Sequence, residues 1–239
     1  FEINLQHRAD VLQAADEAAL LRRLITSVMR SRGKDATFMS KPFQDDTGSG
    51  MHVHLSLQDS ASNNMFAPDR EGADRLLSQA IGGLQATMAE SMAIFAPNIN
   101  AWRRFGPNLC VPVTRDWGEN NRSVAFRIPP GEAAARRIEH RGAGAEANPY
   151  LVLAAVLAGV HHGISAGLDA GAAVTGNAGE EMDPSLPATL WDALAAFRKA
   201  EVLGDYLGAD YIPLYAEIKQ GEFDEFMARP FRREFDWYA

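Results

Sequence analysis

Two imidazoles and a hydroxyl alternate with apolar side chains in one short stretch of this chain. Residues 45–57 read D-D-T-G-S-G-M-H-V-H-L-S-L, and the alternating polar side chains are His52, His54 and Ser56. Period-two alternation is typical of a half-buried strand, because successive side chains point to opposite faces. The two imidazoles then lie about 6.6 Å apart on one face. Gly48, just before this row, allows a tight turn or a close approach of the backbone to a ligand.

A second group of candidate residues is cationic. Arg137, Glu139 and Arg141 alternate along another expected strand, so their side chains share one face. The guanidinium group binds carboxylate and phosphate through two parallel hydrogen bonds. Further arginines precede this strand, at Arg103, Arg104, Arg122 and Arg127. Arginines that project together from a sheet indicate a clamp for phosphate and carboxylate groups.

Nitrogen and oxygen ligands for a metal are present as well. Glu2, His52 and Glu139 form a mixed set, in which carboxylates suit Mg²⁺ or Mn²⁺ and an imidazole favours Mn²⁺ without excluding Mg²⁺. Arginines and a divalent metal together are typical of phosphoryl transfer. Each pattern also has an ordinary interpretation, because a His-x-His strand is usually a solvated face and Arg-x-Glu-x-Arg is more often a surface charge ladder.

The composition narrows the class of protein. The chain has 239 residues, 46% of them hydrophobic, which is enough for one large domain or two small ones. Its net charge of −8 and the lack of a long basic run argue against nucleic acid or an anionic membrane as a partner. A single cysteine excludes an internal disulfide and fits a cytoplasmic protein. The longest apolar run, residues 150–160, is far short of a bilayer span.

Hydrophobic periodicity indicates an α+β domain whose sheet is mainly antiparallel and flanked by helices. Strands are expected at residues 1–5, 36–41, 52–57, 123–128 and 136–141. Helices are expected at 16–32, at 71–95 with a weak point at Gly82-Gly83, and at 149–168. Residues 97–112 and 169–187 are expected to be irregular. The remaining C-terminal part is expected to be helical, with breaks at Gly204, Gly208, Pro213, Gly221 and Pro230.

Several motifs occur in the order and spacing of a known enzyme family. Lys41-Pro42 precedes G-S-G-M-H-V-H-L-S-L at 48–57, N-R-S and R-I-P lie within 121–129, and R-R-I-E-H-R and A-N-P-Y lie within 136–150. Together they resemble the signatures of the glutamine synthetases. The resemblance is strong up to the helix at Tyr150 and weaker towards the C-terminus. It implies the fold of the glutamine synthetase catalytic domain.

The resemblance also implies a site for ATP with Mg²⁺ or Mn²⁺. Metal ligands are implied at Glu2 for a first ion, and at His52 and Glu139 for a second ion on the γ-phosphate. Nucleotide contacts are implied at His54, Ser56, Arg127 and Arg137. In the family these groups stabilise the negative charge that gathers between phosphate and carboxylate.

Glutamate is the implied substrate to be activated. Arg122 aligns with the arginine that steadies the transferring phosphoryl group, and Gly48 lies where the family's backbone meets glutamate. Arg104 and Arg141 align with arginines that hold glutamate and its γ-phosphoryl intermediate. In the family reaction the γ-carboxylate becomes an acyl phosphate, which an amine then attacks.

Cys110 is the main departure from the family pattern. Counted from Arg104, it stands where glutamine synthetases carry a glutamate that shapes the ammonium pocket and takes the proton. Relatives that ligate glutamate to larger amines, the γ-glutamylpolyamine synthetases, also lack that acid and carry a W-G-x-x-N-R segment like residues 117–122. We therefore expect an organic amine or polyamine as acceptor, with Cys110 in its pocket. No partner base is evident for this thiol, so a nucleophilic role is not expected.

Two smaller departures concern substrate contact and regulation. Thr47 replaces the usual asparagine beside the glycine, which leaves a substrate contact there in question. Residues 169–187 contain no tyrosine, so adenylylation of a tyrosine in that loop is not expected.

The leading hypothesis is an ATP-dependent ligase that joins the γ-carboxylate of glutamate to an amine. Residues 1–239 are expected to be the C-terminal portion of the catalytic domain, with the N-terminal domain and the start of the catalytic domain absent. We expect this portion alone to have an incomplete metal site and little ligase activity, and the full-length protein to form a ring-type homo-oligomer. The alternatives are a true glutamine synthetase that uses ammonia, a phosphagen-type kinase, and an inactive scaffold.

Overall fold

Four strands of three residues each form one sheet. They are β1 (Val53–Leu55), β2 (Trp117–Glu119), β3 (Phe126–Ile128) and β4 (Ile138–His140), in the spatial order β1-β4-β3-β2. Strand β4 is antiparallel to both β1 and β3, whereas β2 and β3 are parallel. The expected α+β fold with a mainly antiparallel sheet is confirmed, and the parallel pair is a feature that the sequence pattern did not predict.

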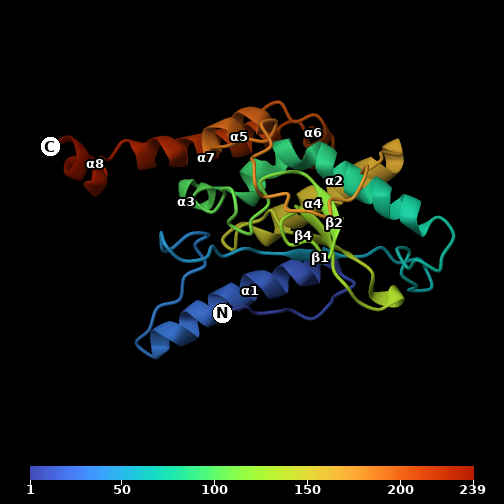
Figure 1. The fold of residues 1–239 in the computed structure, drawn as a ribbon. Coiled ribbons are helices and arrows are strands. Elements are labelled where there is room, and N and C mark those ends of the chain that lie inside the picture. Colours follow the sequence, from blue (N-terminus) through green and yellow to red (C-terminus); the bar gives the residue numbers. More distant parts are fainter.

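Helices make up the rest of the regular structure in the computed structural model, which describes all residues from 1 to 239. They are α1 (Val11–Ser31), α2 (Ala73–Phe95), α3 (Ile99–Trp102), the short 3-10 helix η1 (Ala133–Ala135), α4 (Pro149–Ala166), α5 (Leu190–Phe197), α6 (Val202–Leu207), α7 (Tyr211–Met227) and α8 (Arg232–Tyr238). In Figure 1, α1 runs along one side of the molecule and α5 to α7 along the other, with the sheet between them. Helix α8 projects at the C-terminal end (Figure 1).

The apolar face of the sheet belongs to one continuous core with α2 and α4. Phe126, Ile138 and the imidazole of His140 are fully buried there, and the His140 ring packs 4.5 Å from that of Phe95. Burial lowers the pKa of His140 to about 3, so the ring is neutral and packs as an aromatic side chain. Because side chains alternate along a strand, burying this face directs Glu139 and its neighbours to the opposite face.

Helix α4 is strongly apolar up to Val160, where one face of it packs into the core, and His161 and His162 follow towards its C-terminal end. Its 18 residues would suffice in length and composition to cross a membrane, but eight of them are buried against other parts of the protein. Its N-terminus is capped by Asn148, whose side chain accepts from the amides of Tyr150 and Leu151. It is therefore a core helix and carries no evidence for a membrane.

Glycines allow α2 and α4 to approach closely. A Cβ atom added at Gly83 would lie 2.6 Å from Cα of Gly163, closer than side chains approach in folded proteins. The glycine pair at 82–83 that looked like a weak point in a helix is therefore a packing requirement.

Replacing Gly83 with alanine is expected to destabilise the fold by about 1–3 kcal/mol, because overpacking forces the two helix backbones apart. Gly221→Ala is the matched control, since that helical glycine has open space around it and alanine there favours the helix by up to about 1 kcal/mol. Urea unfolding of both variants measures the difference. Equal effects would contradict the packing argument.

The expected helices form, but some of them begin or end at other residues than expected because capping side chains fix their ends. Helix α1 starts five residues earlier than expected, because Asp10 Oδ1 accepts from the amides of Leu12 and Gln13 at 2.9 and 3.1 Å. Helix α7 runs through Pro213, which lies in its first turn, where no intrahelical donor is needed. It also continues through Gly221, so neither residue breaks the helix.

Two expected strands do not form. Residues 1–5 are exposed and without regular structure, and residues 1–8 make no backbone hydrogen bond. Residues 36–41 have no regular structure, and they are held by the Asn100 side chain and by a backbone hydrogen bond from Ser49 to the Ser40 carbonyl instead of a neighbouring strand. Asn100 accepts from the amide of Lys41 at 2.9 Å and donates to its carbonyl at 2.8 Å. Alternation alone predicted strands, yet a strand also needs a partner that supplies a ladder of hydrogen bonds.

Candidate active site

The polar face of the sheet carries a row of functional side chains, one from each of three adjacent strands. In the strand register, His54 on β1 lies opposite Glu139 on β4, and Glu139 lies opposite Arg127 on β3. The next position in the row is Gly118 on β2. The predicted face of alternating residues on β4 is confirmed, because Arg141 Nη1 donates to Glu139 Oε1 at 2.6 Å.

Glu139 is the centre of this row. It is only 2% exposed, and its second oxygen accepts from Arg127 Nη1 at 2.8 Å. Nδ1 of His52 lies 3.2 Å from the first oxygen. Burial alone would raise the pKa of Glu139, but hydrogen bonds from His52, Arg141 and Arg127 outweigh burial and hold the pKa well below its usual range. The carboxylate is therefore charged at neutral pH.

His54 is held as a neutral imidazole. Arg137 Nε donates to its Nδ1 at 3.1 Å, so the ring proton belongs on Nε2. Burial lowers the pKa of His54, and the positive charges of Arg137 and Arg127 lower it further against the opposing effect of Glu139. The free Nε2–H can donate a hydrogen bond to a ligand above the sheet. Ser56, two residues further along the chain, is half-buried just after β1.

His52 and Glu139 fit a divalent cation as two of its ligands. His52 Nδ1 and Glu139 Oε1 are 3.2 Å apart. This is close to the spacing of about 3.0 Å between adjacent ligands of an octahedral ion with bonds of 2.1 Å. No group of three histidine, cysteine, aspartate or glutamate side chains converges in this chain. His52 and Glu139 would therefore hold an ion only together with further ligands from outside this cluster.

The charge balance of the site favours an anion. Arg127 and Arg141 contact the Glu139 carboxylate, and Arg137 contacts the neighbouring His54. Three guanidinium groups and one carboxylate leave a local net charge of +2 in a chain whose net charge is −8. A divalent cation next to two arginines needs further negative charge. A metal bound together with phosphate groups satisfies both the cation and the arginines.

Arg104 lies against residues 48–50, which we call the glycine loop. It is 3% exposed, and its guanidinium donates to the carbonyls of Arg141, Gly142 and Ala143 at 3.0–3.1 Å. Burial lowers its pKa to about 10, so it remains charged at neutral pH. A Cβ atom added at Gly48 would meet the Arg104 side chain at 2.8 Å. The two residues predicted to meet glutamate are thus in contact, with the arginine supporting the loop.

Cys110 belongs to the same neighbourhood through its backbone. Arg141 Nη2 donates to the Cys110 carbonyl at 3.4 Å, and the residue itself is exposed. Its φ angle of +55° is a left-handed conformation that a non-glycine residue rarely adopts. Arg122 is exposed and follows Asn121 in the connection between β2 and β3.

Glu2 is the candidate that the structure does not bring to this cluster. It was expected on a strand that does not form, and it lies exposed in the irregular residues 1–8. Within this chain it belongs to no group of three or more histidine, cysteine, aspartate or glutamate side chains that could hold a metal ion.

Asn120 is a site residue that the sequence analysis missed. Its side-chain oxygen accepts from Arg127 Nη2 at 2.9 Å and so fixes the guanidinium that contacts Glu139. The residue adopts φ +49°, a conformation that asparagine tolerates better than most residues. The available signal was the W-G-x-x-N-R segment, in which Asn120 is one of the variable positions.

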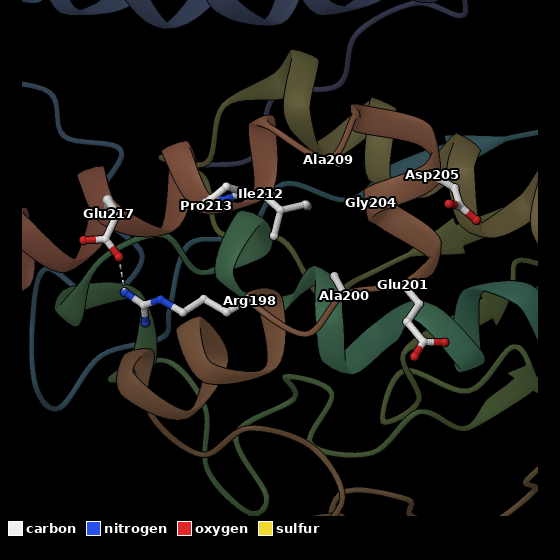
Figure 2. A pocket seen from close by; sticks show the side chains of 9 residues that line it. All are labelled: Arg198, Ala200, Glu201, Gly204, Asp205, Ala209, Ile212, Pro213 and Glu217. Carbon is white, nitrogen blue, oxygen red and sulfur yellow. Dashed lines mark hydrogen bonds and ion pairs between the residues drawn. The ribbon is translucent and has the colours of Figure 1, made fainter.

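An open cavity of about 600 Å³ lies elsewhere, among α5, α6 and α7. Figure 2 shows the residues that line it, all between 198 and 217, with Arg198 and Glu217 paired at 3.1 Å. It shares no residue with the polar face of the sheet, and its carboxylates at Glu201 and Asp205 point away from that pair (Figure 2). The chemistry described above therefore does not extend to this cavity.

Comparison with known proteins assigns the family. Residues 1–238 match the family model described as the glutamine synthetase catalytic domain. The chain belongs to the glutamine synthetase family. This confirms the resemblance carried by the motifs, and a phosphagen-type kinase is therefore not supported.

Individual relatives include amine ligases and glutamine synthetases. The chain is 42% identical over 238 residues to gamma-glutamylputrescine synthetase PuuA of Escherichia coli, covering 99% of this chain and 50% of the relative. It is 35% identical over 233 residues to glutamate–isopropylamine ligase of a Pseudomonas species, covering 94% and 50%. It is 34% identical over 247 residues to glutamine synthetase of Halobacterium salinarum, covering 99% and 54%.

A solved structure agrees with the fold. Ligand-free GmaS superimposes with a TM-score of 0.83 at 32% identity, over 96% of this chain and 54% of that one. The complex of GmaS with ADP gives the same TM-score at 33% identity, over 95% and 54%. The chain thus spans about half the length of the relatives that it matches.

His52→Ala is expected to weaken Mn²⁺ binding by the full-length protein by at least about tenfold, because even groups that only support a metal ligand are worth 10- to 100-fold. The half-exposed imidazole contributes little to the core, so the unfolding midpoint should hardly change. Calorimetric titration with Mn²⁺ measures the affinity, and His54→Ala, two residues further along the chain, is the control. Unchanged affinity would mean that the histidine row is only a solvated face.

Proposed function

We propose that this chain forms the ATP- and metal-binding part of a ligase that joins the γ-carboxylate of glutamate to an organic amine. The observation that carries the proposal is the row of His54, Glu139 and Arg127, with His52 beside it. The row combines two metal ligands with a surplus of positive charge on one face of a sheet. Membership of a family that contains named glutamate–amine ligases supports it.

The proposed reaction has two steps. A γ-carboxylate oxygen of glutamate attacks the γ-phosphorus of ATP, so that an acyl phosphate forms and ADP leaves. The amine nitrogen then attacks the acyl carbon, phosphate leaves, and the nitrogen loses a proton. A bound Mg²⁺ or Mn²⁺ ion would supply shielding of phosphate charge.

The residues of this chain position and stabilise the charged groups in both steps. Arg127 and Arg137 are proposed to bind ATP phosphates, with His54 and Ser56 on the nucleotide. Arg122 is proposed to steady the transferring phosphoryl group, and its exposure leaves it free to do so. Arg141 is proposed to hold the γ-carboxylate and its phosphoryl form, with Arg104 keeping the glycine loop in place below it.

An organic amine is the proposed acceptor because Cys110 brings no charge to its loop. A carboxylate at this position would attract ammonium and take its proton, whereas an exposed thiol does neither. The relatives named for putrescine and isopropylamine support the same direction. A small aliphatic amine or polyamine is therefore the substrate class that we propose.

Glutamine synthesis from ammonia is the second candidate. It is favoured by the match to glutamine synthetase of Halobacterium salinarum at 34% identity. One assay separates the two, namely phosphate release by the full-length protein with ATP, glutamate and Mg²⁺ or Mn²⁺. The acceptors are ammonium, putrescine, spermidine, ethanolamine and an aromatic amine.

Higher kcat/KM for an organic amine than for ammonium is the expected result, and preference for ammonium would overturn our interpretation of Cys110. Failure of the full-length protein to bind ATP with Mn²⁺ would indicate an inactive scaffold instead.

We further propose a cytoplasmic enzyme that works as a ring-type homo-oligomer, with no nucleic acid or membrane partner. Analytical ultracentrifugation of the full-length protein tests the oligomer.

A further inference from the structure

The loop between α4 and α5 is fastened to the segment that carries both Arg122 and Cys110. Six residues along 108–123 bond to residues 171–183, which we call the bracing loop. Asn108, at one end of residues 108–123, and Asn121 and Ser123, at the other end, all bond to the same six residues of the bracing loop, 174–179.

Asn121 makes the densest set of these contacts. Its Nδ2 donates to the carbonyls of Val174 and Gly176 at 3.0 and 2.8 Å. Its Oδ1 accepts from the amide and the hydroxyl of Ser123 at 2.9 and 2.6 Å. The Ser123 hydroxyl in turn accepts from the amide of Ala178 at 2.9 Å. Arg122 lies between two residues that the bracing loop fixes, so the loop sets the path of the backbone from which this arginine projects.

The same loop also holds the start of the Cys110 segment. The amide of Asn108 donates to the Gly179 carbonyl at 2.8 Å, and Asn177 Nδ2 donates to Asn108 Oδ1 at 3.1 Å. Asn108 and Cys110 both have positive φ angles, +59° and +55°. Such backbone conformations cost of order 1–3 kcal/mol and persist where the surroundings determine them. The bracing loop provides such surroundings two residues before Cys110.

Contacts at the sheet edge tie the bracing loop to the row of site residues. The amide of Val174 donates to the Trp117 carbonyl at 2.8 Å, and Trp117 Nε1 donates to the Gly171 carbonyl at 3.1 Å. A Cβ atom added at Gly118 would lie 2.5 Å from the Val174 carbonyl oxygen, so only glycine fits there. Gly118 is the neighbour of Arg127 in the sheet. At the C-terminal end of the bracing loop, Asp183 pairs with Arg115 at 3.0 Å.

We infer that the bracing loop is a positioning element that fixes the amine-acceptor segment at Cys110 relative to Arg122. Asn121 and Asn177 are its positioning residues. The inference rests on the proposed ligase function. In that reaction the acyl phosphate made next to Arg122 must meet the amine that enters past Cys110. Because the two positions are joined through residues 174–179, the loop sets the geometry of the second step.

Asn121→Asp tests the link to Arg122 in the full-length protein. The change keeps the size and the acceptor oxygen but replaces the two donated hydrogen bonds with repulsion between a carboxylate and two carbonyls. We expect kcat to fall roughly 10- to 100-fold, because a displacement near 1 Å has that effect on an aligned reaction, with KM for ATP unchanged. Asn121→Gln, which keeps a donor on a longer arm, should recover part of the loss.

Asn64→Asp is the matched control, because Asn64 Nδ2 also donates to two backbone carbonyls, those of Ala134 and Arg136. It carries the same loss of bonds without touching the bracing loop. An equal fall in kcat in both variants, with equal loss of thermal stability, would reduce the role of Asn121 to general stability and overturn the inference.

Asn177→Ala tests the other end of the bracing loop. It removes the donor to Asn108 and the acceptor for the Gly179 amide. We expect a higher KM for the amine, with KM for ATP and glutamate unchanged. An unchanged KM for the amine would contradict the link to the Cys110 segment.

Hydrogen exchange separates this inference from the proposed function. In Asn121→Asp, the amides of Val174, Ala178 and Asn108 should exchange faster than in the unchanged protein, while those of the α2–α4 core should not. An active enzyme whose Asn121→Asp variant keeps wild-type kinetics and exchange overturns the inference alone. A protein that is inactive with every amine overturns the proposed function, and the exchange result then decides whether the loop positions the segment.

Discussion

Glu139→Ala is expected to lower kcat of the full-length protein in the proposed ligase reaction by about 100-fold or more. The change removes a proposed metal ligand and the carboxylate that pairs with Arg127 and Arg141. Charge stabilisation is often the largest catalytic contribution, and the loss of one well-placed group costs about 10²–10³ in kcat. Phosphate release with saturating glutamate and amine measures the effect, and wild-type rates would reject the metal role.

The same substitution should also reduce stability. Glu139, Arg127 and Arg141 have side chains that are 3%, 13% and 7% exposed, and removing one partner of a buried ion pair typically costs about 3–5 kcal/mol. Glu139→Gln keeps the volume and one acceptor oxygen, so it separates loss of charge from loss of packing.

A surface pair provides the control. Glu217→Gln breaks the exposed pair with Arg198 at 3.1 Å and should leave both kcat and the unfolding midpoint unchanged. If Glu139→Gln folds normally, binds Mn²⁺ as tightly as the unchanged protein and turns over at a normal rate, then Glu139 is a structural partner of the arginines and no metal ligand.

The parts of the site that follow strand periodicity could be predicted from the sequence. His52, His54, Glu139 and Arg141 fall on one face because side chains alternate. In the structure His52 and Arg141 contact Glu139, and His54 lies opposite Glu139 on the neighbouring strand. Register between strands was not readable. That His54 and Arg127 both lie opposite Glu139 depends on how three strands align, which no local pattern specifies.

Contacts between segments that are far apart in the sequence could not be predicted from local sequence patterns. The burial of Arg104 under the glycine loop joins residues 48, 104 and 143, and the bracing loop joins 108–123 to 171–183. Strand β2 has only three residues and no alternation of polar and apolar type, so it had no signal of its own. The strand expected at residues 1–5 failed for the converse reason, because a good pattern there has no partner in this chain.

Cys110→Glu is expected to shift acceptor preference of the full-length protein towards ammonium. A carboxylate on this exposed loop offers a charge-assisted hydrogen bond to a small cation and accepts its proton. Such bonds contribute about 1.5–3 kcal/mol, which corresponds to roughly a 10- to 100-fold change in the ratio of kcat/KM for ammonium to that for the organic amine. Steady-state rates with ammonium and putrescine measure that ratio.

Cys110→Gln is the matched control, because glutamine has the same length and the same difficulty with a φ angle of +55° but no charge. Any change that both variants share therefore comes from bulk or from backbone strain, and only the difference between them reports on charge. Arg141 Nη2, which contacts the Cys110 carbonyl, could pair with the new carboxylate and reduce its effect. The argument for charge as the determinant of acceptor choice fails if glutamate and glutamine move the ratio equally.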